Sequence, residues 1–96
     1  MKNLTFKRYD SLELLAIFTD DEWKTYRFFM PNVQKSWATY WWSFLKTLAN
    51  LYANADYTNE NKIVNNWYNY IEQFYNQWLL EPFDILDTNQ NQNETI

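Results

Sequence analysis

The chain has 96 residues, 22% of them aromatic, and its formal net charge at pH 7 is −4. It contains no Gly, Cys or His, which excludes disulfides, thiolate nucleophiles, cysteine-based metal sites, glycine-rich phosphate loops and dinucleotide fingerprints. General acid–base catalysis near neutral pH would then require a carboxylate, Lys or Tyr with a strongly shifted pKa. We therefore predict a single domain that is not an enzyme and that binds no cofactor and no metal.

Residues 1–9 alternate loosely between polar and apolar side chains, and we predict that they form an extended arm or a short strand. Asp10 is followed three residues later by Glu13, a spacing typical of a helix start because each side chain can satisfy a free backbone N–H group. A first short helix is therefore expected after Asp10. Its buried side would consist of Leu12, Leu15, Ala16 and Phe18.

The segment from Thr19 to Glu22 repeats this capping pattern and adds two acidic residues at the positive end of a helix dipole. It predicts a second short helix from about Asp20 to Phe29. Pro31 is expected to end this helix, because the residue before a proline is disfavoured in helical geometry.

A third helix is predicted from about Val33 to Asn54. At about 100° per residue, one set of apolar side chains falls within about 80° of Trp37. This set consists of Tyr40, Trp41, Phe44, Leu45, Leu48, Leu51 and Tyr52. Trp42 does not fit the pattern, because it falls about 140° from Trp37. Since the chain has no Gly, turns that need a positive φ are expected to use Asn or Asp.

A fourth helix is predicted from about Asn59 to Leu80, with Thr58 as its cap and Pro82 as its stop. One apolar face repeats at helical spacing and is formed by Ile63, Trp67, Tyr70, Ile71, Phe74 and Trp78. Tyr68, Tyr75 and Leu79 widen this face.

Two shorter segments flank this helix. Asp56–Glu60 has oxygen-bearing side chains at alternating positions, as calcium loops do, but Asn61 stands where such a loop requires Gly and Trp67 where it requires a bidentate Glu. Phe83–Leu86 is apolar and is predicted to form one helical turn docked on the rest of the chain.

These elements predict an all-α fold. It would be a small bundle of four helices, with the two short N-terminal helices packed on a long antiparallel helical hairpin. Residues 1–86 would form this single helical domain, with an extended arm at residues 1–9. The polar, low-complexity residues 87–96 are predicted to be a disordered tail.

The aromatic residues are more numerous than a bundle of this size can bury, so some are expected to face a partner. Trp and Tyr are enriched at the energetic centres of protein interfaces. We predict a partner-binding surface on the two long helices, formed by Trp42, Tyr68, Glu72, Tyr75 and Leu79. The other interpretation is that these rings pack their apolar bodies on the protein and leave only their polar tips in water.

Charge is also uneven: residues 1–49 carry seven basic and five acidic side chains, whereas residues 50–96 carry seven acidic side chains and Lys62 alone. The first hypothesis is therefore a non-catalytic protein-interaction module that binds a macromolecular partner through an aromatic helical face and an acidic C-terminal half. The composition resembles that of small inhibitors or adaptors from phages and mobile elements. We expect a cytoplasmic protein, in a host cell if it is viral, with no membrane contact and no small-molecule substrate.

Two alternatives remain open. One is a self-associating virion or structural subunit, which would make the chain a homo-oligomer. The other is a nucleic-acid-binding module that uses the basic N-terminal segment, where Lys2, Lys7 and Arg8 interleave with Phe6 and Tyr9. Nucleic acid is the less favoured partner, because most of the rings lie outside this segment and the C-terminal half is acidic.

Overall fold

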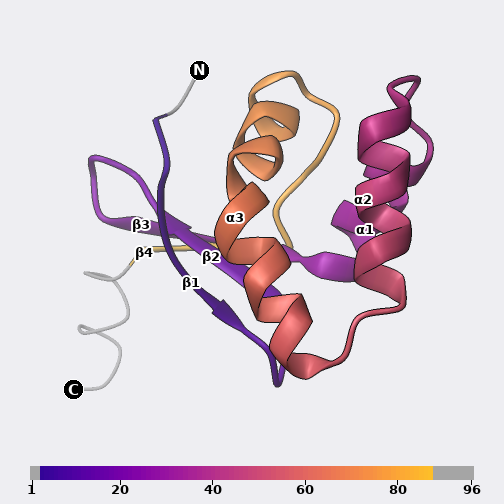
Figure 1. The fold of residues 1–96 in the computed structure, drawn as a ribbon. Coiled ribbons are helices and arrows are strands. Elements are labelled where there is room, and N and C mark those ends of the chain that lie inside the picture. The colour runs from indigo at the N-terminus through magenta and orange to yellow at the C-terminus, as the bar shows by residue number, and fades with distance from the viewer. Residues whose placement is uncertain (1–2, 88–96) are drawn as a thin grey trace.

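The computed structural model describes residues 3–87. This part of the chain forms an α+β fold (Figure 1). The strands are β1 (Thr5–Asp10), β2 (Leu15–Thr19), β3 (Lys24–Phe29) and β4 (Asp84–Asp87). Between β3 and β4 come the helices α1 (Met30–Ala38), α2 (Ser43–Ala53) and α3 (Tyr57–Asn76). The predicted all-α four-helix bundle is therefore wrong.

The four strands form one antiparallel sheet in the order β1-β2-β3-β4. The first three strands follow one another as hairpins. The last strand returns after all three helices and pairs with β3, with Arg27 opposite Asp84 and Tyr26 opposite Ile85. Figure 1 shows α3 crossing one face of this sheet, with α1 and α2 packed beside it.

The segment predicted as the first short helix instead forms the turn between β1 and β2, followed by β2. Asp10 accepts hydrogen bonds from the backbone N–H groups of Leu12 and Glu13, at 3.0 and 3.3 Å, and thereby closes the turn between β1 and β2. The same side-chain-to-backbone bonds cap helices and close turns, so the spacing of Asp10 and Glu13 does not distinguish the two. Leu12, expected to be buried, is 93% exposed.

The segment predicted as the second short helix instead forms the turn between β2 and β3, followed by β3. Asp20 accepts from the N–H groups of Glu22 and Lys24, at 2.9 and 3.0 Å. The residues after the turn are aromatic and β-branched at many positions, which suits a strand, and Tyr26 and Phe28 alternate into the core. The alternation of Tyr26 and Phe28 outweighs the capping pattern, because residues two positions apart lie on one face of a strand but on nearly opposite faces of a helix.

Pro31 begins a helix instead of ending one. It lies in the first turn of α1, where a proline loses no hydrogen bond and its fixed φ already suits the helix. The predicted third helix at 33–54 is divided into α1 and α2 by residues 39–42. Trp42, the residue that did not fit the helical pattern, is the N-cap of α2, with extended angles of φ −80° and ψ 117°.

The predicted fourth helix corresponds to α3, which begins slightly earlier and ends earlier than expected. Its cap is Asp56, whose side chain accepts from the N–H of Asn59 at 2.9 Å, and not Thr58. Residues 84–86, predicted as part of a helical turn, belong to β4. Residues 88–96 of the predicted tail lie outside the described residues.

The hydrophobic core lies between one face of the sheet and the helices. Phe18 of β2 and Phe28 of β3 meet edge to face with ring centroids 5.4 Å apart. The largest fully buried side chains are Trp37, Phe18, Phe28, Met30, Leu45, Ile71, Val33 and Val64. Burial of a large apolar side chain contributes roughly 1.5–3 kcal/mol, so these residues account for much of the driving force that holds α1 and α3 on the sheet.

Candidate functional site

Four of the six tryptophans are exposed, and all four lie in connections between helices and strands. Their exposed fractions are 68% for Trp23, 78% for Trp41, 38% for Trp42 and 93% for Trp78. Tryptophan is highly buried on average in folded proteins, and it is the residue most enriched at the energetic centres of interfaces. These four side chains therefore mark the surfaces at which binding is to be sought.

Trp78 occupies a position that usually belongs to glycine. Its N–H donates to the carbonyl of Tyr75 at 3.2 Å, and the N–H of Leu79 donates to the carbonyl of Phe74 at 2.9 Å. These two bonds define a Schellman motif in which Trp78 is the residue that takes the left-handed conformation. Its φ is 63°, so the backbone there carries strain that a glycine would avoid.

Trp23 has the same unusual conformation in the β2–β3 hairpin, with φ 64°. Its N–H donates to the carbonyl of Asp20 at 3.1 Å, and the N–H of Asp20 donates to the carbonyl of Lys24 at 3.1 Å. This is the three-residue hairpin whose last position favours glycine. Within residues 3–87 the positive φ values belong to Leu14, Trp23 and Trp78, so the expectation that Asn or Asp would fill such positions is wrong.

We expect Trp78→Gly to fold with unchanged or greater stability, by up to about 1.5 kcal/mol. The left-handed conformation costs a non-glycine residue about 1–2 kcal/mol, and glycine avoids this cost. Glycine also gives the unfolded chain more conformational entropy, which offsets about 0.4–1 kcal/mol of the gain in stability. Little burial is lost, because the side chain is 93% exposed. Urea denaturation followed by circular dichroism measures this change. The matched variant Trp78→Ala keeps the strained backbone, so an alanine variant more stable than the glycine variant would contradict the assigned conformation.

A pocket of about 440 Å³ opens beside Trp78, between the end of α3 and β4. We call it the Trp78 pocket. It is lined by Tyr75, Trp78, Leu80, Glu81, Pro82, Asp84 and Ile85. Its volume lies within the range of about 300–1,000 Å³ that is usual for ligand sites. Aromatic and apolar side chains make most of its wall, and carboxylates are the charged groups in its lining.

A second concavity of about 290 Å³ lies on the other side of α3, and we call it the Trp42 groove. It is lined by Tyr40, Trp41, Trp42, Leu45, Tyr70, Gln73, Phe74 and Gln77. Trp42 meets Tyr70 with ring centroids 5.8 Å apart, and Tyr40 meets Phe74 at 4.8 Å. Rings from the α1–α2 connection therefore close over α3 and leave Trp41 at the rim.

Three of the five predicted binding residues fasten α3 to the sheet. Tyr68 stacks on Phe6 of β1, with ring centroids 4.5 Å apart and planes 6° from parallel. Glu72 accepts a hydrogen bond from the N–H of Leu4 at 3.2 Å. Tyr75 lies against Tyr26 and Phe28, 5.7 Å from each ring. These ring and backbone contacts give Tyr68, Glu72 and Tyr75 a structural role on this side of α3.

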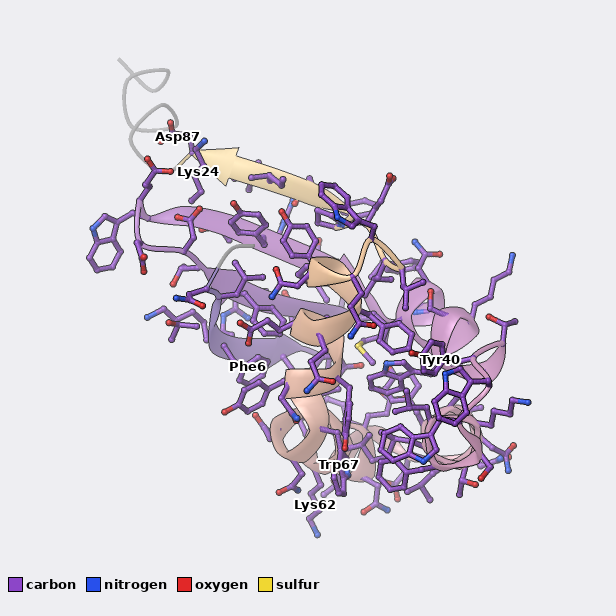
Figure 2. The ribbon with its side chains drawn as sticks, turned by 90° about the horizontal axis from the view of Figure 1, so that it is seen from above. Phe6, Lys24, Tyr40, Lys62, Trp67 and Asp87 are labelled. Carbon is purple, nitrogen blue, oxygen red and sulfur yellow. The ribbon has the colours of Figure 1, made fainter. Side chains whose placement is uncertain are left out.

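The five predicted residues therefore do not form one continuous patch. Trp42 lies on the side of α3 that faces α2, and Figure 2 shows the two sides clearly, with Phe6 on one and Tyr40 on the other. Leu79 follows the end of α3 and is 44% exposed. Trp42 and Tyr68 are 38% and 36% exposed and Tyr75 is half-buried, so none of the three rings is fully enclosed.

Sequence reasoning missed the exposure of two tryptophans, Trp78 and Trp41. Trp78 was assigned to the apolar face of a helix that would reach Leu80, whereas the helix ends at Asn76. No local signal marks that end, because the usual glycine is missing. For Trp41 a signal does exist: Trp42 falls about 140° from Trp37 and does not fit the helical face, which marks the interruption between α1 and α2.

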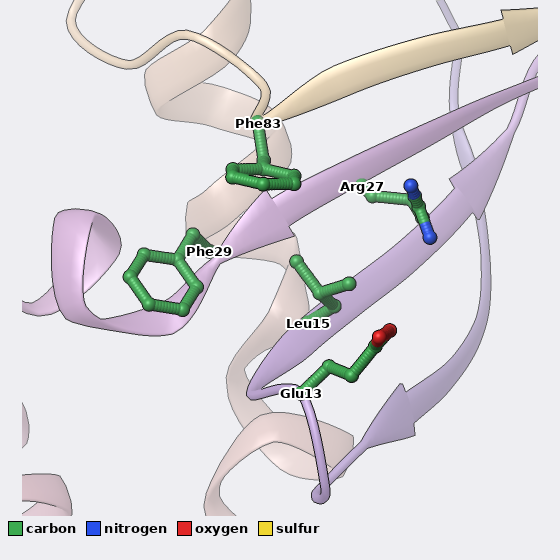
Figure 3. Close-up of a pocket in the computed structure, with 5 residues that line it drawn as sticks. All are labelled: Glu13, Leu15, Arg27, Phe29 and Phe83. Atoms are coloured by element: carbon green, nitrogen blue, oxygen red, sulfur yellow. The ribbon is translucent and has the colours of Figure 1, made fainter.

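The opposite face of the sheet contains a smaller pocket of about 130 Å³, lined by Glu13, Leu15, Arg27, Phe29 and Phe83. Figure 3 shows it on the side of the sheet turned away from α3, with the carboxylate of Glu13 directed toward Arg27. Arg27 Nε donates to Asp84 Oδ1 at 2.7 Å, and its Nη2 pairs with the second oxygen.

The pKa of Arg27 is raised above its ordinary value, first by the hydrogen bond that Arg27 donates to Asp84 and also by the charges of Asp84, Glu13 and Asp10, against an opposing effect of burial. The guanidinium is therefore already neutralised by its own chain. Its bidentate bond holds β4 against β3, and we assign this pocket a structural role.

Tyr9 forms a buried polar cluster with Tyr52 and Glu60. The Tyr9 hydroxyl donates to Glu60 Oε1 at 2.9 Å and shares a hydrogen bond of 2.7 Å with the Tyr52 hydroxyl. Burial, the largest cause, raises the pKa of both phenols, and for Tyr9 the bonds to Tyr52 and Glu60 raise it further. Phenols held in this way stay protonated near neutral pH.

Within residues 3–87 no group of three or more acidic side chains is placed to hold a metal ion. The ring pair proposed for base stacking is engaged inside the protein, since Phe6 stacks on Tyr68 and Tyr9 is 7% exposed. None of the helices α1, α2 and α3 combines the length and the apolar character needed to cross a membrane. Comparison of the chain with protein-family models, with curated proteins and with solved structures found no match in any of the three.

Proposed function

We propose that this chain is a non-catalytic protein-interaction module that docks on one macromolecular partner through the surface around the end of α3. Its composition and size are those of a small phage or mobile-element inhibitor or adaptor that acts in the cytoplasm, in a host cell if it is viral. The observation that carries this proposal is Trp78, which is 93% exposed and held at φ 63°.

An exposed tryptophan at a glycine position has no explanation in the stability of the chain itself. It contributes little burial, and its backbone conformation costs about 1–2 kcal/mol. Such strain is found where a residue serves binding or catalysis. The surrounding side chains support binding, because Leu79, Phe83 and Ile85 are 44%, 59% and 47% exposed and come from the same short segment.

The test is quantitative capture of partners on the immobilised protein from a lysate of the cells in which it acts, read by mass spectrometry. Trp78→Gly is expected to lose the specifically captured protein by at least tenfold. Trp23→Gly is the matched comparison, because it makes the same change at an exposed tryptophan with a positive φ that lies outside the Trp78 pocket. Equal loss of the captured protein in both variants would contradict the choice of the Trp78 surface. Equal capture by the original chain and by Trp78→Gly would contradict the proposed surface.

Self-association would use the same exposed rings and must be separated from binding to another protein. Sedimentation equilibrium from micromolar to millimolar concentration distinguishes the two. The proposal predicts a monomer of 11.9 kDa throughout this range. A mass that rises with concentration in the original chain but not in Trp78→Gly would instead support a self-associating structural subunit.

A further inference from the structure

We infer that the Trp78 pocket receives an arginine side chain of a basic partner segment. This inference rests on the proposed function and specifies the partner's chemistry. Tyr75 and Trp78 bring two aromatic rings to the pocket, and Glu81 and Asp84 bring two carboxylates. A cation over an aromatic ring is attracted by the negative face of the ring, and a carboxylate beside that ring completes the recognition of a guanidinium.

The two carboxylates have different roles. Both oxygens of Asp84 are engaged by Arg27, so Asp84 has little charge to offer a partner. Glu81 is exposed, and among residues 3–87 no hydrogen bond or ion pair to it is found. Glu81 is therefore the carboxylate left to bind a cation in this pocket.

Charge also argues against other occupants. No Lys or Arg lines the pocket, so the charged groups that an anion would meet in its lining are both carboxylates. A purely apolar side chain would remove Glu81 from water without a partner, which is unfavourable for a charged group. A basic side chain avoids both penalties, and the excess of acidic groups in residues 50–96 adds attraction over a longer range.

Arginine fits these walls better than lysine does. Its guanidinium is planar, stacks on aromatic faces and can form two parallel hydrogen bonds to one carboxylate, whereas the lysine ammonium is a compact and strongly hydrated charge. The volume of about 440 Å³ leaves room for the aliphatic stem of the arginine to lie along the apolar part of the wall.

The experiment uses an acetylated, amidated tripeptide with a central arginine, titrated into the full chain labelled with nitrogen-15. The indole N–H signal of Trp78 and the backbone signals of Glu81 and Ile85 are expected to shift together and to saturate at about millimolar concentration. The same peptide with citrulline, which keeps the shape of arginine without its charge, is expected to bind at least fivefold more weakly. A peptide with a central lysine is expected to be weaker than the arginine peptide.

Two variants with the same change in net charge test whether the pocket itself carries the effect. Glu81→Gln is expected to weaken arginine-peptide binding at least fivefold, whereas Asp21→Asn, at the exposed tip of the β2–β3 hairpin, should change it less than twofold. Equal weakening by both variants would show a non-specific charge effect and would overturn the inference. So would equal binding of the citrulline or lysine peptide.

The outcome also separates this inference from the proposed function. If the arginine peptide does not bind while Trp78→Gly still loses its captured partner, the surface remains the binding site and only the assigned partner chemistry is wrong. If the peptide does not bind and Trp78→Gly captures the same proteins as the original chain, both proposals fail.

Discussion

Replacement of Trp37 by alanine is expected to lower the free energy of unfolding by about 3–5 kcal/mol, the usual result when a buried tryptophan is removed from a core. Trp37 is fully buried and heads the largest enclosed side chains of the protein. It lies in α1 and belongs to the cluster that joins this helix to the sheet and to α3. A domain of this size has a total stability of about 5–15 kcal/mol, so this single change removes a large fraction of it.

Trp37→Phe is the matched variant, and its expected loss is below about 1.5 kcal/mol. The indole Nε1 of Trp37 has no hydrogen-bond partner among the described residues. An unpaired buried donor costs about 1–3 kcal/mol, and phenylalanine removes this donor while it keeps a ring in the core. Urea denaturation of both variants measures the difference. An alanine variant within about 1 kcal/mol of the original chain would place Trp37 outside the core.

Alkaline pH is expected to destabilise the fold steeply. Tyr9, Tyr26 and Tyr52 are all buried, and burial is the largest cause of the raised pKa of each phenol. For Tyr26 the hydrogen bond to Asp20, of 2.8 Å, raises the pKa further. In the unfolded chain these tyrosines ionise near pH 10, whereas in the fold they remain protonated.

The direction of the effect follows from this difference. The stabilising contribution is fully present below about pH 10, and it is lost as the pH rises from there toward the raised pKa values of the folded state. The slope grows as the unfolded tyrosines ionise, and each phenol that is still protonated in the fold contributes at most about 1.4 kcal/mol per pH unit. The three together therefore contribute at most about 4 kcal/mol per pH unit. Urea denaturation between about pH 8 and pH 11, with tyrosinate absorbance recorded in parallel, measures the slope.

Tyr26→Phe provides the control for this prediction. It removes one of the three groups, so the slope above about pH 10 should fall by about a third, even though the variant is less stable at pH 8 because Asp20 loses a donor. A stability that stays constant up to about pH 11 would contradict the burial of these phenols.

Trp37 and Trp78 show why composition alone could not identify the site. The two residues are chemically identical, and both fell on apolar faces of predicted helices. One is fully enclosed and the other is 93% exposed. The difference arises from the Schellman motif after Asn76, which ends α3 and places Trp78 in the left-handed conformation outside the helix. Replacement is therefore expected to have opposite effects on stability at the two positions.

Several features followed from the sequence alone. The absence of Gly, Cys and His excluded whole classes of chemistry, and the excess of aromatic residues indicated that some rings would be exposed. Most of α3 was predicted, because a long run of apolar residues at helical spacing depends only on neighbouring positions. Asp10, Asp20 and Pro31 were also recognised as boundaries between elements, and the structure has boundaries there.

The type of element on each side of those boundaries was decided by the tertiary structure. Asp10 and Asp20 make the same local bonds in a turn as at a helix start, so only pairing between strands could settle the question. That pairing is not local: Arg27 and Asp84, whose bond attaches β4 to the sheet, are 57 positions apart in the chain. The Trp78 pocket depends on the same closure, because the return of the chain from α3 to β4 brings Asp84 and Ile85 to its wall.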